Sequence, residues 1–192
     1  MYYNAKNVQQ LYQYSLPTCD FLVVGDRVDT IPDYAFFDRN IGTVIISDSV
    51  KHIGNYAFGR SAEGYQGGSF VIGASILSIG SNAFKNCVNL RQLNLPNTQN
   101  IGDSAFYGCT NIQNIHLGDD LVTLGANTFY NCSNIHSITI PDKVDSIGKY
   151  AFYGCSNVDS IYLGRNLRTI GSEAFGGCSN LKYMHYNAKN LQ

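Results

Sequence analysis

The sequence predicts a solenoid, in which about eight short coils stack on one another and place a parallel β-sheet along one side. The first observation is a fixed period: seven Phe residues are spaced by 22, 26, 22, 23, 23 and 23 residues, at Phe36, Phe58, Phe84, Phe106, Phe129, Phe152 and Phe175. The second is an apolar residue five positions before each Phe. The third is that a unit of 23 residues cannot bury its own apolar face, so units must stack.

Each unit contains two apolar blocks. The apolar residues of the first block are spaced as in residues 135–140. In the last part of this block apolar and polar residues alternate, which predicts a strand of about three to five residues. A turn with Pro or Gly beside Asp or Asn follows, as at Pro141 and Asp142. The second block, such as residues 144–152, is too short for a stable helix and predicts a short extended piece and a tight turn. Strands in register would then form one parallel sheet with a spacing of about 4.8 Å.

Residues 144–155 and 167–178 carry the more specific pattern, an Ile-Gly followed by Ala-Phe and Gly-Cys. This pattern resembles the BspA-like class of leucine-rich repeats, and the resemblance covers residues 19–192. It implies a curved leucine-rich repeat solenoid of the α/β type, with the sheet on the concave face, irregular or extended segments on the convex face and little regular helix. It also implies no catalytic activity and a surface or secreted bacterial protein, since several members are adhesins for host matrix proteins.

The two ends of the chain share a sequence. Residues 1–7 match residues 184–190 at six of seven positions, close to eight periods away. We expect residues 1–18 to form a degenerate N-terminal unit or cap and residues 19–192 to form the solenoid. The match fits either two similar caps or a segment of a longer array, and the second is favoured because a solenoid should end in a polar unit. The N-terminus lacks the basic and apolar regions of a signal peptide.

Composition excludes several classes of function. The net charge is −1, charged residues make up 14% of the chain and no basic stripe is present, so nucleic acid is not expected as a partner. No apolar run approaches 18 residues, so we expect no membrane insertion by this segment. Residues 59–69 carry three extra residues and four Gly, which predicts a protruding loop, either functional or a neutral insertion.

Five of the six Cys lie three positions after a repeat Phe and form one column, Cys87, Cys109, Cys132, Cys155 and Cys178. No CxxC pair is present, so the pattern does not support a zinc site. In a stack in register their Cβ atoms would lie about 4.8 Å apart, farther than the ~3.8 Å that a disulfide prefers. We therefore predict buried free thiols that act as small core residues.

A second column lies two residues after each Cys: Asn89, Asn111, Asn134, Asn157 and Asn180. We expect these amides to bond the backbone of their own coil and the next, satisfying buried polar groups. Of the four His, only His116 and His185 fall at the middle strand position, about 15 Å apart, and cannot share a metal. Asp119, Asp120 and Asp142 are expected in turns for conformational reasons. No cofactor, metal or catalytic residue is predicted.

Function is expected where the repeat leaves residues free to vary, on the outward side of the strands. The middle column there contains Val23, Ile45, Val71, Asn94, His116, Thr139, Tyr162 and His185, and the neighbouring column contains Phe21, Thr43, Ser69, Gln92, Asn114, Ser137, Ser160 and Tyr183. The candidate ligand-binding residues are Asn94, Asn114, His116, Thr139, Tyr162, Tyr183 and His185. Exposed aromatics suit protein recognition, although outward strand positions favour aromatic and β-branched residues in any case.

The function predicted is a non-enzymatic interaction module at the cell surface or in a secreted protein. It would bind a host or neighbouring-cell surface or matrix protein, or a glycan, through the concave strand face. The alternative is a structural spacer that projects another domain and has no ligand of its own. A hydrolase with attached repeats would need a catalytic domain outside this segment. The low charge and the many Asn and Ser residues are compatible with a module or a spacer.

Overall fold

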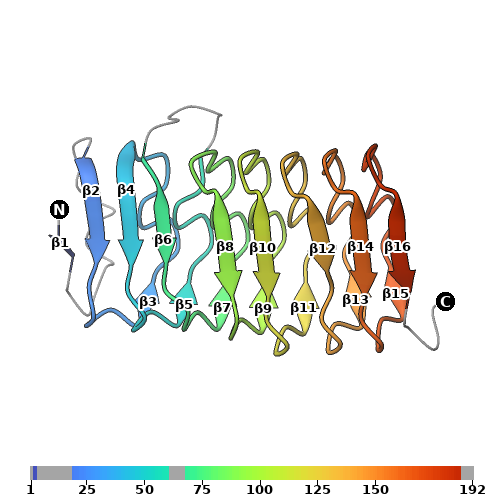
Figure 1. Cartoon of the computed structure of the whole chain (residues 1–192). Helices are drawn as coiled ribbons and strands as arrows, with labels where there is room; N and C mark the ends of the chain where they lie inside the picture. The colour runs from blue at the N-terminus through green and yellow to red at the C-terminus, as the bar shows by residue number, and fades with distance from the viewer. Residues whose placement is uncertain (1, 4–18, 61–67, 187–192) are drawn as a thin grey trace.

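The computed structural model describes residues 2–3, 19–60 and 68–186, and within these ranges it is a β-solenoid without helices. One face carries the longer strands (Figure 1), which are β2 (Cys19–Val24), β4 (Ile41–Ile46), β6 (Phe70–Ile72), β8 (Gln92–Leu95), β10 (Asn114–Leu117), β12 (Ser137–Thr139), β14 (Ser160–Leu163) and β16 (Tyr183–Tyr186). These are the first apolar blocks of the units, as predicted. We call this side the strand face.

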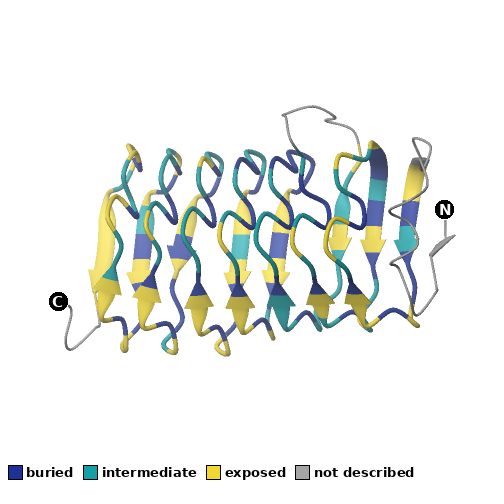
Figure 2. Ribbon diagram, turned by 180° about the vertical axis from the view of Figure 1, so that it is seen from behind, coloured by how far each residue is buried: buried dark blue, intermediate teal, exposed yellow. Residues whose placement is uncertain are grey.

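The opposite face carries one two-residue strand per unit, followed by a turn (Figure 2). These strands are β3 (Thr30–Ile31), β5 (His52–Ile53), β7 (Ser78–Ile79), β9 (Asn100–Ile101), β11 (Thr123–Leu124), β13 (Ser146–Ile147) and β15 (Thr169–Ile170). They pair in chain order into one parallel sheet of seven strands. The second block of each unit is therefore a short extended piece and a tight turn, as predicted. We call this side the turn face.

The longer strands are parallel and share one face, as predicted, and their hydrogen bonds divide them into three ladders. The first is β1-β2-β4-β6, in which β1 (Tyr2–Tyr3) pairs with β2; the others are β8-β10 and β12-β14-β16. Between β10 and β12 the His136 N–H donates to the Gln113 carbonyl at a long 3.4 Å. Continuity of the stack is thus carried by the turn face, whose short strands repeat with less variation in length.

The turns on the turn face repeat one backbone conformation at the same position of each unit. The third residue after each repeat Ile or Leu has a left-handed backbone although none is Gly, with φ between 53° and 57° at Tyr34, Tyr56, Asn82, Ser104, Asn127, Tyr150 and Glu173. The Gly of the Ile-Gly pair serves another purpose. A Cβ on Gly148 would lie 2.4 Å from the carbonyl carbon of Gly125 in the previous coil. Ile-Gly is therefore needed because adjacent coils approach there backbone to backbone.

The core is one continuous column between the two faces. The repeat Phe rings stack along it at centroid distances of 5.2–5.6 Å and interplanar angles of 4–15°. Phe84, Phe106, Phe129 and Phe152 are fully buried. Inward strand residues such as Ile138 and Ile161 pack against them. Because each ring contacts the ring before and after it, the Phe column couples every coil to its neighbours.

Candidate functional site

The predicted outward columns lie on the strand face as expected. Asn94 is in register with His116, and Thr139 with Tyr162, which is in turn in register with His185. In the neighbouring column Gln92 is in register with Asn114, and Ser160 with both Ser137 and Tyr183. All seven candidate residues are exposed: Asn94, Asn114, His116, Thr139, Tyr162, Tyr183 and His185. Within each ladder they form two parallel rows, on β8 and β10 and again on β12, β14 and β16.

Aromatic side chains gather at the C-terminal end of this surface. The Tyr162 and His185 rings stack at a centroid distance of 4.5 Å with an interplanar angle of 1°. Tyr183 lies on β16 beside them and is 62% exposed, while Tyr162 is 44% exposed. We call Tyr162, Tyr183 and His185 the strand-face aromatic cluster. It combines large apolar rings with hydroxyl and imidazole groups on two neighbouring strands.

The N-terminal end of the same surface is apolar. Phe21, Ile45 and Val71 are exposed, and Ile45 is in register with both Val23 and Val71. The degenerate N-terminal unit or cap expected at residues 1–18 lies outside the described residues, except that Tyr2 and Tyr3 pair with Val23 and Val24 in the backbone ladder. The loop predicted at residues 59–69 falls largely on residues 61–67, which are also outside the description. The strand face therefore has an apolar end and an aromatic polar end.

The five column cysteines are buried and free, as predicted: Cys87, Cys109, Cys132, Cys155 and Cys178. They are also more than small apolar residues. Each thiol donates a hydrogen bond to a Phe carbonyl on the neighbouring coil, and the Sγ of Cys109 lies 3.0 Å from the oxygen of Phe84. Burial raises the pKa of the Cys87 thiol to about 12 and holds the pKa of Cys132 well above its ordinary value. These thiols are neutral donors and not nucleophiles.

The asparagine column is only partly the buried ladder that we expected. Asn89 is buried, and the Asn111 amide donates to the Val88 carbonyl of the previous coil at 2.7 Å. Asn157 and Asn180 are exposed, and Asn157 donates to the side chain of Asn134 and not to the backbone. The prediction is wrong for these two because backbone groups meet there directly: the Asn157 N–H donates to Ser133 and the Asn180 N–H to Ser156.

Turn aspartates have a role between coils that spacing alone did not predict. The Asp142 carboxylate accepts the backbone N–H of Arg165 at 2.8 Å and also pairs with the Arg165 guanidinium on the next coil. Hydrogen bonds from Arg165 lower the pKa of Asp142. Lys143 and Asp120 form a second ion pair between coils at 2.6 Å. Both pairs are exposed, so each adds little to stability.

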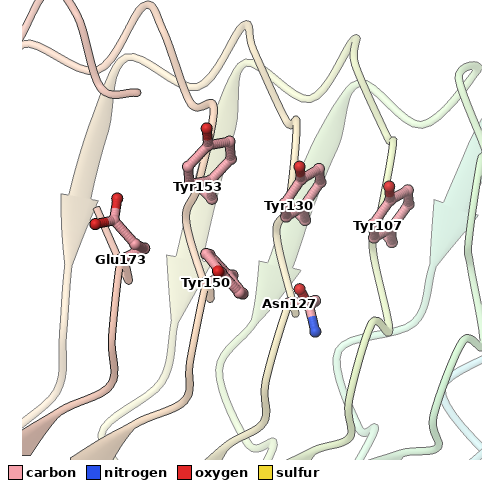
Figure 3. Close-up of a pocket in the computed structure, with 6 residues that line it drawn as sticks. All are labelled: Tyr107, Asn127, Tyr130, Tyr150, Tyr153 and Glu173. Carbon is pink, nitrogen blue, oxygen red and sulfur yellow. The ribbon is translucent and has the colours of Figure 1, made fainter. Parts of the chain in front are cut away.

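A second aromatic surface, which the repeat pattern was not used to predict, lies on the turn face. Tyr107, Tyr130 and Tyr153 directly follow three repeat Phe residues and stack in a row, with centroids 4.7 and 5.1 Å apart (Figure 3). Tyr150 packs edge-to-face against Tyr130 and Tyr153. An open concavity of about 590 Å³ lies here, and its lining consists of Tyr107, Asn127, Tyr130, Tyr150, Tyr153 and Glu173. The signal available was the 23-residue spacing of the three Tyr residues.

The described residues place no group of three or more His, Cys, Asp or Glu side chains where they could hold a metal ion. His116 and His185 are separated along the strand face by β12 and β14. A helix long and apolar enough to cross a membrane is likewise absent from residues 2–3, 19–60 and 68–186. The two aromatic surfaces are consequently the main candidate sites.

Solved structures of similar fold include bacterial leucine-rich repeat proteins. A leucine-rich repeat protein from T. pallidum superposes with a TM-score of 0.65 at 21% identity, covering 89% of this chain and 71% of that one. A leucine-rich cell surface protein from Faecalibacterium prausnitzii has a TM-score of 0.54 at 20% identity, covering 88% of this chain and 48% of that one. The pneumococcal vaccine antigen PcpA has a TM-score of 0.54 at 18% identity, with coverage of 88% and 51%. The chain spans about half the length of the last two.

No curated protein sequence is significantly similar to this chain. A sequence model described as the BspA-type leucine-rich repeat region matches in six copies, over residues 5–64 and 70–192. These ranges include the Phe, Cys and Ile-Gly positions that build the described coils. The chain therefore belongs to the BspA-type leucine-rich repeat family.

Proposed function

We propose that this chain is a non-enzymatic interaction module that binds a protein partner through the strand face. The observation that carries the proposal is the distribution of large apolar side chains that are exposed within the described residues. Of nine such residues, five lie at outward positions of the longer strands: Phe21, Ile45, Val71, Tyr162 and Tyr183. Met184 and Tyr186, also on β16, are in register with the buried Ile161 and Leu163 and so belong to the inward side of the last described coil. Exposed apolar side chains that gather on one face are typical of interaction surfaces.

The aromatic end of the strand face is the expected centre of the contact. Tyr supplies a large contact area at a small cost in conformational entropy, and its hydroxyl can still form a hydrogen bond. Stacking on His185 holds the Tyr162 ring in one orientation before a partner binds. The neighbouring rows of Asn94, Asn114, His116 and Thr139 supply polar contacts around it. We place the partner among surface or matrix proteins of a host or a neighbouring cell.

The same proposal places the protein at the bacterial surface or among secreted proteins. Support comes from the family and from similar structures described as a leucine-rich cell surface protein and a vaccine antigen. A chain with 14% charged residues and a net charge of −1 is compatible with this location. Fractionation of cells that produce the native protein, with detection by an antibody to this chain, tests the location. Detection only in the cytoplasmic fraction would contradict it.

The binding experiment compares the protein with two double variants on a panel of purified extracellular-matrix and plasma proteins. Tyr162→Ala with Tyr183→Ala removes the rings from the strand face, and we expect saturable binding to weaken at least tenfold. The matched control is Thr123→Ala with Thr169→Ala, which changes two exposed residues of the turn-face sheet and should leave binding unchanged. If folded protein binds nothing on the panel, or if the Tyr variant binds normally, the spacer function replaces this proposal.

A further inference from the structure

The tyrosine row on the turn face has the geometry of a second binding site. We refer to Tyr107, Tyr130 and Tyr153 as the tyrosine ladder. Its rings are nearly parallel, at 0° and 14°, and the hydroxyls of all three point the same way, out of one edge of the row (Figure 3). The ladder runs along the axis of the solenoid, one ring per coil. It therefore presents a hydroxyl at each step of the stack.

The concavity beside the ladder is large enough for a ligand and has a mixed lining. Its volume of about 590 Å³ lies within the range of ligand sites, which is roughly 300–1,000 Å³. Asn127 supplies an amide, and Glu173, which is exposed, supplies a carboxylate. Together with the Tyr hydroxyls these groups offer both donors and acceptors next to apolar ring edges. Such a lining suits a ligand that is rich in hydroxyls and also has apolar C–H surfaces.

The charges around the ladder argue against a cationic ligand. The ammonium of Lys149 lies 4.8 Å from the centre of the Tyr150 ring, and that of Lys85 lies 5.4 Å from the centre of Tyr107. Cations from the chain itself therefore already occupy positions over these two rings. A neutral ligand meets neither repulsion nor the loss of these contacts.

The C-terminal end of the ladder is held open by a glycine. Gly176 occupies the position that Tyr107, Tyr130 and Tyr153 occupy on the preceding coils. A Cβ there would lie 2.8 Å from the Tyr153 ring and too close to the Glu173 carboxylate. Because Gly176 has no side chain, the Tyr153 ring and the Glu173 carboxylate both occupy the space beside it. Tyr153 and Glu173 are thereby brought together at the end of the concavity, as an aromatic group beside a hydrogen-bond acceptor.

Backbone conformation adds an independent observation. Tyr150 and Glu173 have φ of 57° and 55°, in the left-handed region where Asn and Gly are preferred. Asn127 and Asn82 show the preferred residue type at the same position of other coils. A bulky ring in this conformation costs about 1–3 kcal/mol, so fold stability favours Asn over Tyr at position 150. Tyr34 and Tyr56 have the same conformation on the first coils, and of these three Tyr residues Tyr150 is the one that lines the concavity.

We propose that the tyrosine ladder and its concavity bind a neutral linear polysaccharide lying along the axis of the solenoid. A 1,4-linked chain of pyranose rings advances by about one coil spacing per sugar, so successive sugars would meet successive Tyr hydroxyls. The edges of the stacked Tyr rings contact the C–H surfaces of the sugars, while Asn127 and Glu173 bond sugar hydroxyls. This site is on the opposite side from the strand face, and it does not depend on the function proposed there.

The test measures binding of cellohexaose, xylohexaose and mannohexaose to the whole chain by isothermal titration calorimetry. At least one should bind, and Tyr130→Ala with Tyr153→Ala should weaken that binding at least tenfold. The matched control is Tyr34→Ala with Tyr56→Ala, which removes another stacked Tyr pair, at a centroid distance of 4.9 Å, from the turns of the first coils. This control should bind as the parent does.

A second variant separates binding from folding. Tyr150→Asn places a residue suited to φ of 57° at the rim of the concavity, so its thermal midpoint should equal or exceed that of the parent. Its affinity for the same oligosaccharide should fall at least threefold. If folded parent protein binds none of the three sugars, or if the ladder variant binds as well as the parent, the ladder is a stabilising stack only. Such a result would leave the strand-face experiment unaffected.

Discussion

Tyr162 and His185 lie on adjacent strands with their rings 4.5 Å apart and parallel to within 1°. The stack arises because both occupy the middle outward position, and β14 and β16 pair in register there. The inward neighbours on the same strands differ from them in exposure. Ile161 is fully buried, whereas Tyr162, one residue later, is 44% exposed. The period of two along a strand thus separates residues of the core from residues of the surface.

This alternation predicts opposite effects for adjacent substitutions. Tyr162→Ala should change the free energy of unfolding by only about 0.5 kcal/mol, because its ring is on the surface. Ile161→Ala should cost roughly 2–5 kcal/mol, because it leaves a cavity beneath the same strand. Urea unfolding followed by circular dichroism measures both. Equal losses would mean that β14 does not present these two residues to opposite sides.

The Phe column predicts a gradient of stability along the stack. Phe129 is buried and stacks on both Phe106 and Phe152 at 5.2 Å, so Phe129→Ala should cost about 3–5 kcal/mol. Phe175 is half-buried and stacks on Phe152, its one ring partner among the described residues, so Phe175→Ala should cost clearly less. Urea unfolding of the two variants compares them. A larger loss at Phe175 would contradict the gradient.

The glycine of the Ile-Gly pair is predicted to be intolerant of even a methyl group. Gly148→Ala should destabilise the protein strongly, because the new Cβ would lie 2.4 Å from backbone atoms of Gly125 that cannot move independently. The control is Ala126→Gly, which removes a methyl group from the neighbouring coil and should have a small effect. Thermal unfolding of both variants is the measurement. A Gly148→Ala protein as stable as its parent would show that the coils are not packed this closely.

The buried thiols predict a loss of stability in alkaline solution. Burial raises the pKa of Cys87 from 9.0 to about 12 and that of Cys178 to about 11. Above pH 9 the unfolded chain releases these protons while the folded chain keeps them, so the free energy of unfolding falls as pH rises toward 11–12. Below pH 9 this contribution is fully present. Urea unfolding under reducing conditions at several pH values measures the slope.

The thiol contribution is isolated by Cys132→Ala, since Tyr and Lys residues also titrate in this window. The variant should lose some stability at neutral pH, because a cavity replaces the Sγ and its hydrogen bond to Phe106. Its free energy of unfolding should then fall less steeply above pH 9 than that of the parent. Parallel curves for the two proteins would show that the thiol column does not contribute to the pH dependence.

The ion pair between Asp142 and Arg165 predicts a shifted titration. Hydrogen bonds from Arg165 lower the pKa of Asp142 below its ordinary value of 3.8 in the folded state. The associated stability is therefore present above pH 3.8 and is lost as pH falls through the lowered pKa. Carboxyl-detected NMR titration of Asp142 should show the shift, and Arg165→Gln should reverse most of it. An unshifted Asp142 in the parent would contradict the pairing.

The sequence by itself determined the architecture, the phase of the repeat and the direction of most side chains. The constant distance between Ile-Gly and Phe placed the short strands, and the alternation in residues such as 160–163 placed inward and outward positions correctly. These features are local or strictly periodic. A periodic sequence can satisfy its apolar period only by stacking, so the period already contains the long-range contacts of the fold.

The tertiary structure decided what happens between coils. The breaks in the strand-face ladder, the donation from thiols to Phe carbonyls and the exposure of Asn157 all depend on distances of a few tenths of an ångström between neighbours. The turn-face concavity also emerged only there, because Tyr150 and Tyr153 belong to one coil and Glu173 to the next. The period specifies which residues share a column. How closely adjacent columns pack is set by side-chain size and backbone conformation in three dimensions.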